Sequence, residues 1–120
     1  MVKNFKELIV WQKSMDAAKM LYTLVQKLPH EEMFAMSDQM RRCAVSIPSN
    51  IAEGQQRKSI GDFSRFIHIA QGSRAELETQ LLLCVSIGYL CEEEISELMG
   101  VLDEIGKMLS SLDKSLPETI

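Results

Sequence analysis

The sequence predicts a single all-α domain over residues 1–120, folded as an antiparallel, up-down-up-down four-helix bundle with a proline-kinked second helix. Apolar residues recur at three- and four-residue spacing in four separate stretches, and no stretch shows the alternation of a strand. A chain of 120 residues with 46% hydrophobic residues can bury a core without disulfides or metal. Four amphipathic helices joined by short connections bury their apolar stripes most simply in a bundle.

The first helix is predicted over residues 5–28. Asn4 can cap its start, and Glu7 stands three residues later in the position of a capping-box partner. Pro29 ends the apolar period, and residues 29–36 form a polar connection.

The second helix is predicted over residues 38–57, with Ser37 as its cap. Pro48 interrupts the apolar stripe of this helix, and an interior proline removes one backbone hydrogen bond. We therefore expect a kink rather than two helices. The residues around the proline are small, so a neighbouring helix can approach closely at Ser46, Ser49, Ala52 and Gly54.

The third helix is predicted over residues 60–87. Ser59 and Asp62 have capping-box spacing at its start, and Gly88 suits the left-handed conformation that ends many helices. Gly72 lies inside this helix, where glycine costs about 1 kcal/mol relative to alanine. We expect close packing or a bend at that glycine.

The fourth helix is predicted to begin at the acidic run Glu92, Glu93 and Glu94, because negative charge is favourable at a helix N-terminus. A regular apolar stripe follows this run. Pro117 marks the end of the helix.

Three cysteines, Cys43, Cys84 and Cys91, show no CxxC spacing, and their odd number argues against a disulfide framework. We expect small buried thiols in a reducing cytoplasm. His30 and His68 have no ligand-like spacing to the cysteines, so we expect no metal and no cofactor.

The N-terminus has no apolar signal core, and no stretch reaches the roughly 18 apolar residues that a membrane span needs. The sequence therefore predicts a cytoplasmic protein with no membrane partner.

Charge is distributed unevenly along the chain. The net charge is −4, yet residues 41–74 hold six basic residues against two acidic ones, and the remainder holds seven basic against fifteen acidic. Two interpretations stay open: a surface for phosphates or an acidic partner, or mutual attraction between basic and acidic helices. The candidate binding residues are Arg41, Arg42, Arg57, Lys58, Arg65 and Arg74.

A polar stripe runs beside the apolar stripe of the second helix. Ser46, Asn50 and Glu53 share one helical face by their spacing, and Arg57 continues it. This stripe is expected either to face solvent or to join Arg74, Glu76 and Glu78 of the third helix in a structural or interface polar network.

Catalysis is the competing hypothesis for this stripe, with Glu53 as a base or with Glu53, Glu76 and Glu78 as metal ligands. Di-iron bundles use Glu-x-x-His pairs, and neither histidine follows a glutamate by three residues. We therefore expect no catalytic residue and no enzymatic activity.

Several motifs together resemble the family of small bundle proteins encoded by intervening sequences of bacterial 23S ribosomal RNA genes. The most specific block is Ser46-Ile47-Pro48-Ser49-Asn50-Ile51-Ala52-Glu53-Gly54. Other matching segments are Phe5 to Lys13, Arg41-Arg42, Phe63, Phe66, Ala70, Gly72-Ser73, Glu76 to Leu81 and Gly88-Tyr89-Leu90.

The resemblance implies an antiparallel four-helix bundle that assembles into a homopentameric ring, and it implies no known enzymatic activity. The resemblance also implies a related group that is similar in fold, the accessory proteins of diversity-generating retroelements, which form pentamers and bind nucleic acid and a reverse transcriptase. Those relatives are strongly basic, whereas this chain has a pI of about 5.2.

Two hypotheses for function follow. In the first, a non-enzymatic oligomeric module binds RNA, DNA or a ribonucleoprotein through the arginine-bearing second and third helices. In the second, the bundle is a protein-protein interaction scaffold that binds no nucleic acid and uses Trp11, Tyr22 or methionines as contact anchors.

Overall fold

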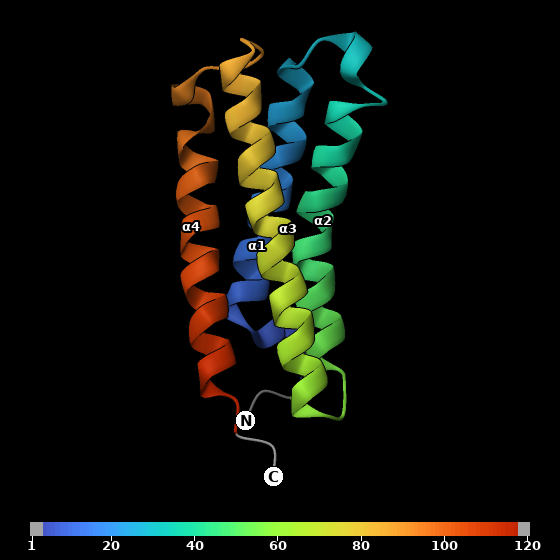
Figure 1. Cartoon of the computed structure of the whole chain (residues 1–120), viewed down its shortest axis with the longest axis vertical. Helices are drawn as coiled ribbons and strands as arrows, with labels where there is room; N and C mark the ends of the chain where they lie inside the picture. Colours follow the sequence, from blue (N-terminus) through green and yellow to red (C-terminus); the bar gives the residue numbers. More distant parts are fainter. Residues whose placement is uncertain (1–3, 118–120) are drawn as a thin grey trace.

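The fold is described by a computed structural model that covers residues 4–117. Four helices dominate it: α1 (Ile9–Leu24), α2 (Met36–Gln55), α3 (Ile60–Ser86) and α4 (Glu92–Ser115). No strand occurs within the described residues. The predicted all-α fold class is confirmed, and consecutive helices run in opposite directions along the long axis (Figure 1).

Each helix packs against two neighbours: α1 and α3 both contact α2 and α4, and the α2–α3 interface is the most extensive. The apolar stripes meet along the axis of the bundle. Fully buried side chains from all four helices include Leu21, Ile47, Leu77, Leu102 and Ile105. Burying each contributes about 1.5–3 kcal/mol.

The start of α1 differs from its prediction. Asn4 caps a separate 3-10 turn, Phe5–Glu7, by accepting a hydrogen bond from the Lys6 backbone N–H at 2.9 Å. Leu8 is extended, so α1 begins only at Ile9. A second 3-10 turn, Val25–Lys27, closes this segment before Pro29.

The prediction that Ser37 caps α2 is wrong. Ser37 lies inside the helix with only 3% of its surface exposed, and the N-cap residue Ala35 makes no side-chain hydrogen bond. Glu32 Oε1 accepts a hydrogen bond from the Met36 N–H at 3.4 Å instead. Glu32 belongs to the 3-10 turn His30–Glu32, which occupies part of the predicted polar connection.

Helix α2 continues through the buried Pro48 without interruption, and a kink at this residue remains a prediction. The close approach between helices occurs at Gly54, where an added Cβ would lie 2.7 Å from the Phe66 Cβ. The expectation of close packing at Gly72 is wrong, because that glycine is exposed with no atom within 4 Å of a Cβ position.

Helix α3 begins and ends as predicted. Ser59 Oγ accepts from the Asp62 N–H at 3.0 Å. Gly88 has a φ of +88°, its N–H donates to the Val85 carbonyl at 3.1 Å, and the Tyr89 N–H donates to the Cys84 carbonyl at 2.9 Å. These two bonds form a Schellman motif, which satisfies carbonyls at the end of α3.

Helix α4 begins at the predicted acidic run. The Cys91 N–H donates to Glu94 Oε1 at 2.9 Å, and Lys27 Nζ lies 3.0 Å from Glu94 Oε2. These interactions hold the pKa of Glu94 below its ordinary value, with the Cys91 backbone bond as the main cause. Leu116 is extended before Pro117, which ends the helix.

The expectation that all three cysteines are buried is wrong for Cys91, which is exposed, whereas Cys43 and Cys84 are buried. Burial, with Glu76 nearby, raises the pKa of the Cys43 thiol to about 11. Within residues 4–117, no helix is long and apolar enough to cross a membrane.

We predict opposite effects for two glycine substitutions in and beside α3. Gly88→Ala should lower the free energy of unfolding by about 1–2 kcal/mol, because a side chain is strained at positive φ. Gly72→Ala should raise it by about 0.5–1 kcal/mol, because the site is open and alanine favours the helix. Urea unfolding followed by circular dichroism measures both, and equal effects would contradict the assigned conformations.

A second prediction concerns pH. The lowered pKa of Glu94 means that its charged form favours the folded state, so this contribution is present above the ordinary value of 4.5 and lost as the pH falls through the lowered value. Glu94→Gln should therefore lower the melting temperature at pH 7, and the difference should shrink below pH 4.5. Glu93→Gln is the matched control in the same turn, and a pH-independent difference for Glu94→Gln would refute the assignment.

Candidate interaction surfaces

A polar seam joins α2 to α3 at the predicted stripe. Ser46 Oγ lies 2.8 Å from Ser73 Oγ, and Asn50 Nδ2 donates to the Ser46 carbonyl at 2.7 Å and to Ser46 Oγ at 2.9 Å. Ser46 therefore connects the two helices, and Asn50 supports Ser46 from the next turn of α2. Ser73, the partner of Ser46, was missed as a site residue, although the Gly72-Ser73 pair is one of the segments that resemble the family.

The other members of the predicted network lie elsewhere. Glu53 near the end of α2 pairs at 3.0 Å with Arg57, four residues later in the turn to α3. Glu76 is exposed, and it helps to raise the pKa of the Cys43 thiol across the interface. Arg74 and Glu78 pair with each other near α4, so the predicted α2–α3 network is in fact two separate networks.

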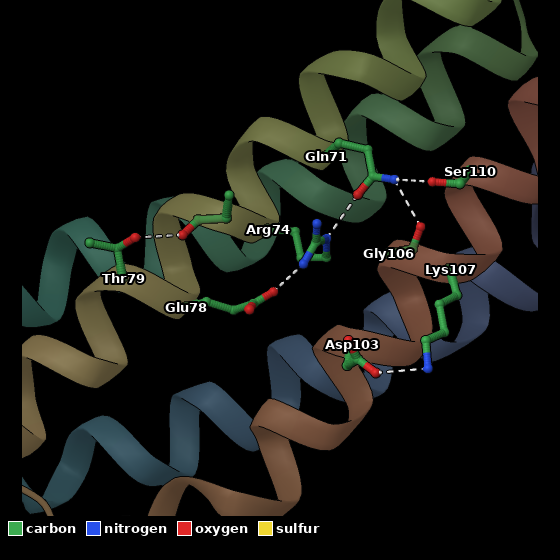
Figure 2. A network of polar contacts seen from close by, with 9 residues as sticks. Gln71, Arg74, Glu78, Thr79, Asp103, Gly106, Lys107 and Ser110 are labelled. Atoms are coloured by element: carbon green, nitrogen blue, oxygen red, sulfur yellow. Dashed lines mark hydrogen bonds and ion pairs between the residues drawn. The ribbon is translucent and has the colours of Figure 1, made fainter.

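The second network connects α3 to α4 (Figure 2). Arg74 Nε donates to Gln71 Oε1 at 2.8 Å, and Arg74 Nη1 donates to Glu78 Oε2. Gln71 Nε2 in turn donates to the Gly106 carbonyl at 2.8 Å and to Ser110 Oγ at 3.2 Å. Gln71, Gly106 and Ser110 were missed as site residues, because contacts between different helices leave no regular spacing in the sequence.

The predicted basic residues do not form one surface on a single chain. Arg41 and Arg42 lie near the start of α2, where Arg41 Nη2 donates to the Met33 carbonyl at 3.0 Å and Arg42 pairs with Asp38 at 3.0 Å. Arg57 follows 16 residues after Arg41, a distance of about 24 Å along a helix.

A second basic group lies at the α2–α3 turn. The guanidinium carbons of Arg57 and Arg65 lie 4.9 Å and 4.5 Å from the centre of the Phe66 ring, and the exposed Lys58 follows Arg57. Arg65 also lies 3.8 Å from Asp62. This group, Arg57, Lys58 and Arg65, is named the turn cluster below.

Ser64, His68 and Asp113 meet between α3 and α4 but lack the order of a catalytic triad. Ser64 Oγ donates to Asp113 Oδ1 at 2.6 Å, and His68 Nε2 lies 3.1 Å from Asp113 Oδ2. The carboxylate therefore stands between serine and histidine, whereas a nucleophilic serine needs the histidine as its base. No group of three metal-ligating side chains occurs in the described part of the chain.

An apolar groove of about 590 Å³ lies between α1 and α2. Trp11 is half-buried, with its ring 5.3 Å from the Phe5 ring, and Tyr22 is 47% exposed. Pro48, a buried residue of the block of residues 46–54, is among the residues that line the groove. The apolar lining comprises Phe5, Trp11, Met15, Ala18, Tyr22, Val45, Pro48 and Ala52.

The sequence matches the model of a known protein family. A model of the 23S rRNA-intervening sequence proteins matches residues 6–111, most of the sequence. The chain belongs to this family. The match includes both polar networks, the turn cluster and nearly all of the apolar groove.

A solved structure supports the same placement of this 23S rRNA-intervening sequence protein. It is a protein of unknown function from the S23 ribosomal protein family of Bacteroides thetaiotaomicron. The two chains are 30% identical with a TM-score of 0.79, and the match covers 89% of this chain and 100% of the other. No curated protein gives a significant match. Family membership therefore establishes the fold and assigns no activity.

Proposed function

We propose that this 23S rRNA-intervening sequence protein is a non-enzymatic binding module that assembles with copies of itself. The apolar groove between α1 and α2 is the observation that supports this proposal most directly. Trp11 and Tyr22, the side-chain types that dominate binding energy at protein interfaces, line the groove.

A ridge on α3 supplies a matching surface on a second copy. Leu83 and Ile87 are one turn apart and 45% and 50% exposed, and Ile69 lies on the same helical face. Groove and ridge are different surfaces, so their contact is heterologous and can close into a ring. Lys19 at the groove and Glu76 on the ridge face add complementary charge. The homopentamer implied by the sequence resemblance is the ring that we propose.

The proposal includes no catalytic step, metal or cofactor. Glu53, the candidate base, is paired with Arg57, and Asp113 is shared by Ser64 and His68. The Asp113 contacts join α3 to α4, and neither group orients a free nucleophile. The cysteine usage favours the cytoplasm as the place where the module acts.

Nucleic-acid binding is the second candidate function, and the turn cluster favours it. Stacking on Phe66 holds Arg57 and Arg65 in place, and Lys58 adds a third positive charge at the same end of the bundle. A ring would repeat this cluster in every subunit and increase avidity. The family that the sequence resembles is expected to be related in fold to retroelement accessory proteins that bind nucleic acid, which favours the same candidate.

We predict that light scattering after size exclusion gives about 68 kDa, the mass of five copies of the 13.6 kDa chain. Tyr22→Glu with Val45→Glu should shift the mass to the monomer, because two buried carboxylates would oppose docking of an apolar ridge. Thr23→Glu is the control on the same helix outside the groove, and it should leave the mass unchanged.

A mixing experiment tests the heterologous geometry. Leu83→Lys with Ile87→Lys removes the ridge, and equal amounts of the groove variant and the ridge variant should form a dimer of about 27 kDa, since one intact groove and one intact ridge remain. Wild-type protein that stays at 13.6 kDa at micromolar concentration would refute self-assembly. Both variants remaining monomeric after mixing would refute this pairing of surfaces.

For the second candidate, we predict that single-stranded RNA binding weakens with salt and depends on the turn cluster. Arg57→Gln with Arg65→Gln should weaken binding by about tenfold or more in fluorescence anisotropy, because each phosphate contact contributes electrostatically. Arg42→Gln, which removes the same kind of ion-paired arginine from the other end of α2, is the control. The absence of binding at low salt would eliminate this candidate and leave the scaffold function.

A further inference from the structure

A polar groove of about 410 Å³ lies between α3 and α4, separate from the apolar groove and the turn cluster. Arg74, Lys107 and Lys114 supply three cations to its lining, and Asp103 supplies one carboxylate. The remaining lining residues are Gln71, Gly106, Ser110 and Ser111, which offer amide and hydroxyl groups. Figure 2 shows part of this lining: Gln71 on α3 reaches Gly106 and Ser110 on α4, and Lys107 extends along α4 to Asp103.

Arg74 is held in place before any ligand binds. Gln71 Oε1 accepts from its Nε at 2.8 Å, Glu78 accepts from its Nη1, and only 23% of the side chain is exposed. A guanidinium has five N–H donors, so three remain without an acceptor among the residues that the structure describes. Such fixed donors lose little entropy when they bind an oxyanion.

Gly106 makes the position of this guanidinium possible. A Cβ at Gly106 would lie 2.7 Å from Arg74 Cζ and from Arg74 Nε, so any other residue at position 106 would push the guanidinium away. Glycine inside a helix costs about 1 kcal/mol relative to alanine. The missing side chain at Gly106 therefore leaves room for the arginine head group against α4.

The two lysines extend the positive lining along α4. Lys107 and Lys114 are exposed and seven residues apart, about 10 Å along the helix, with Ser110 and Ser111 between them. Lys107 also lies 3.2 Å from Asp103, and Glu78 neutralises part of Arg74. These two carboxylates limit the affinity for an anion without removing the donors.

We propose that this groove binds a phosphate group, with Arg74 as the fixed donor and Lys107 and Lys114 as mobile cations. A phosphate offers several oxygens to donors that converge from different directions, which suits guanidinium, ammonium and hydroxyl groups together. The phosphate belongs either to a free phosphomonoester or to a nucleic-acid backbone. This site does not depend on the assembly proposed above.

The first experiment is a titration of inorganic phosphate with the purified full-length protein, followed by phosphorus NMR line broadening at constant ionic strength. A dissociation constant on the order of 1 mM is expected for an exposed site that also contains carboxylates. The absence of broadening with the wild-type protein would overturn the proposal.

Two variants test the site from different sides. Gly106→Ala should displace the guanidinium and weaken binding by about tenfold, while the helical circular dichroism stays unchanged because the clash falls on the end of a flexible side chain. Lys114→Gln should weaken binding about threefold without affecting the fold, since Lys114 is exposed. Lys13→Gln, which removes one charge outside the groove, is the control.

Equal broadening by wild type, Gly106→Ala and Lys114→Gln would overturn the proposal even if phosphate binds somewhere. A short single-stranded RNA without terminal phosphates then distinguishes a nucleic-acid backbone from a free phosphomonoester as the source of the bound phosphate group. Displacement of inorganic phosphate by this RNA would assign the groove to a nucleic-acid backbone. Retention of phosphate in its presence would assign the groove to free phosphomonoesters.

Discussion

The contact between Gly54 and Phe66 is the constraint on which the α2–α3 half of the bundle depends. A Cβ at position 54 would lie 2.7 Å from the Phe66 Cβ, an atom fixed to the backbone, so the two helices can be this close only with glycine there. The same contact brings Arg57, just beyond the end of α2, over the Phe66 ring, which Arg65 approaches from its own helix. Further along the interface, the Ser46–Ser73 hydrogen bond fixes the register.

A second glycine contact, between Gly106 and Arg74, has a different physical character. The guanidinium that approaches Gly106 is the end of a flexible side chain, and it can move without moving α3. Gly54 therefore determines the spacing of two helices, whereas Gly106 determines the position of one charged group. This difference explains why the α3–α4 interface can contain an open polar groove while the α2–α3 interface is closely packed.

The sequence was sufficient for features that depend on local chemistry. Apolar periodicity located four helices, and Ser59 and Gly88 marked the ends of α3 because a cap and a positive φ are local requirements. The prediction that Ser37 caps α2 was wrong because Glu32, several residues earlier, supplies the oxygen that accepts a hydrogen bond at the start of this helix. Within the site, Ser46 and Asn50 were found by spacing, whereas the direction of Arg74 depends on a glycine in another helix, which no spacing rule reports.

The acidic net charge of this chain says little about which surface binds an anion. Charges in solution are screened over about 8 Å at physiological ionic strength, whereas Arg41 near the start of α2 and Arg57 just beyond its end are about 24 Å apart by helical rise. Arg42, Arg57 and Arg74 each pair with a carboxylate four residues away, so their charge is balanced locally. An anion therefore responds to the donors within one groove or cluster. A fixed donor geometry, such as that of Arg74, then influences anion binding more than the net charge of the whole chain does.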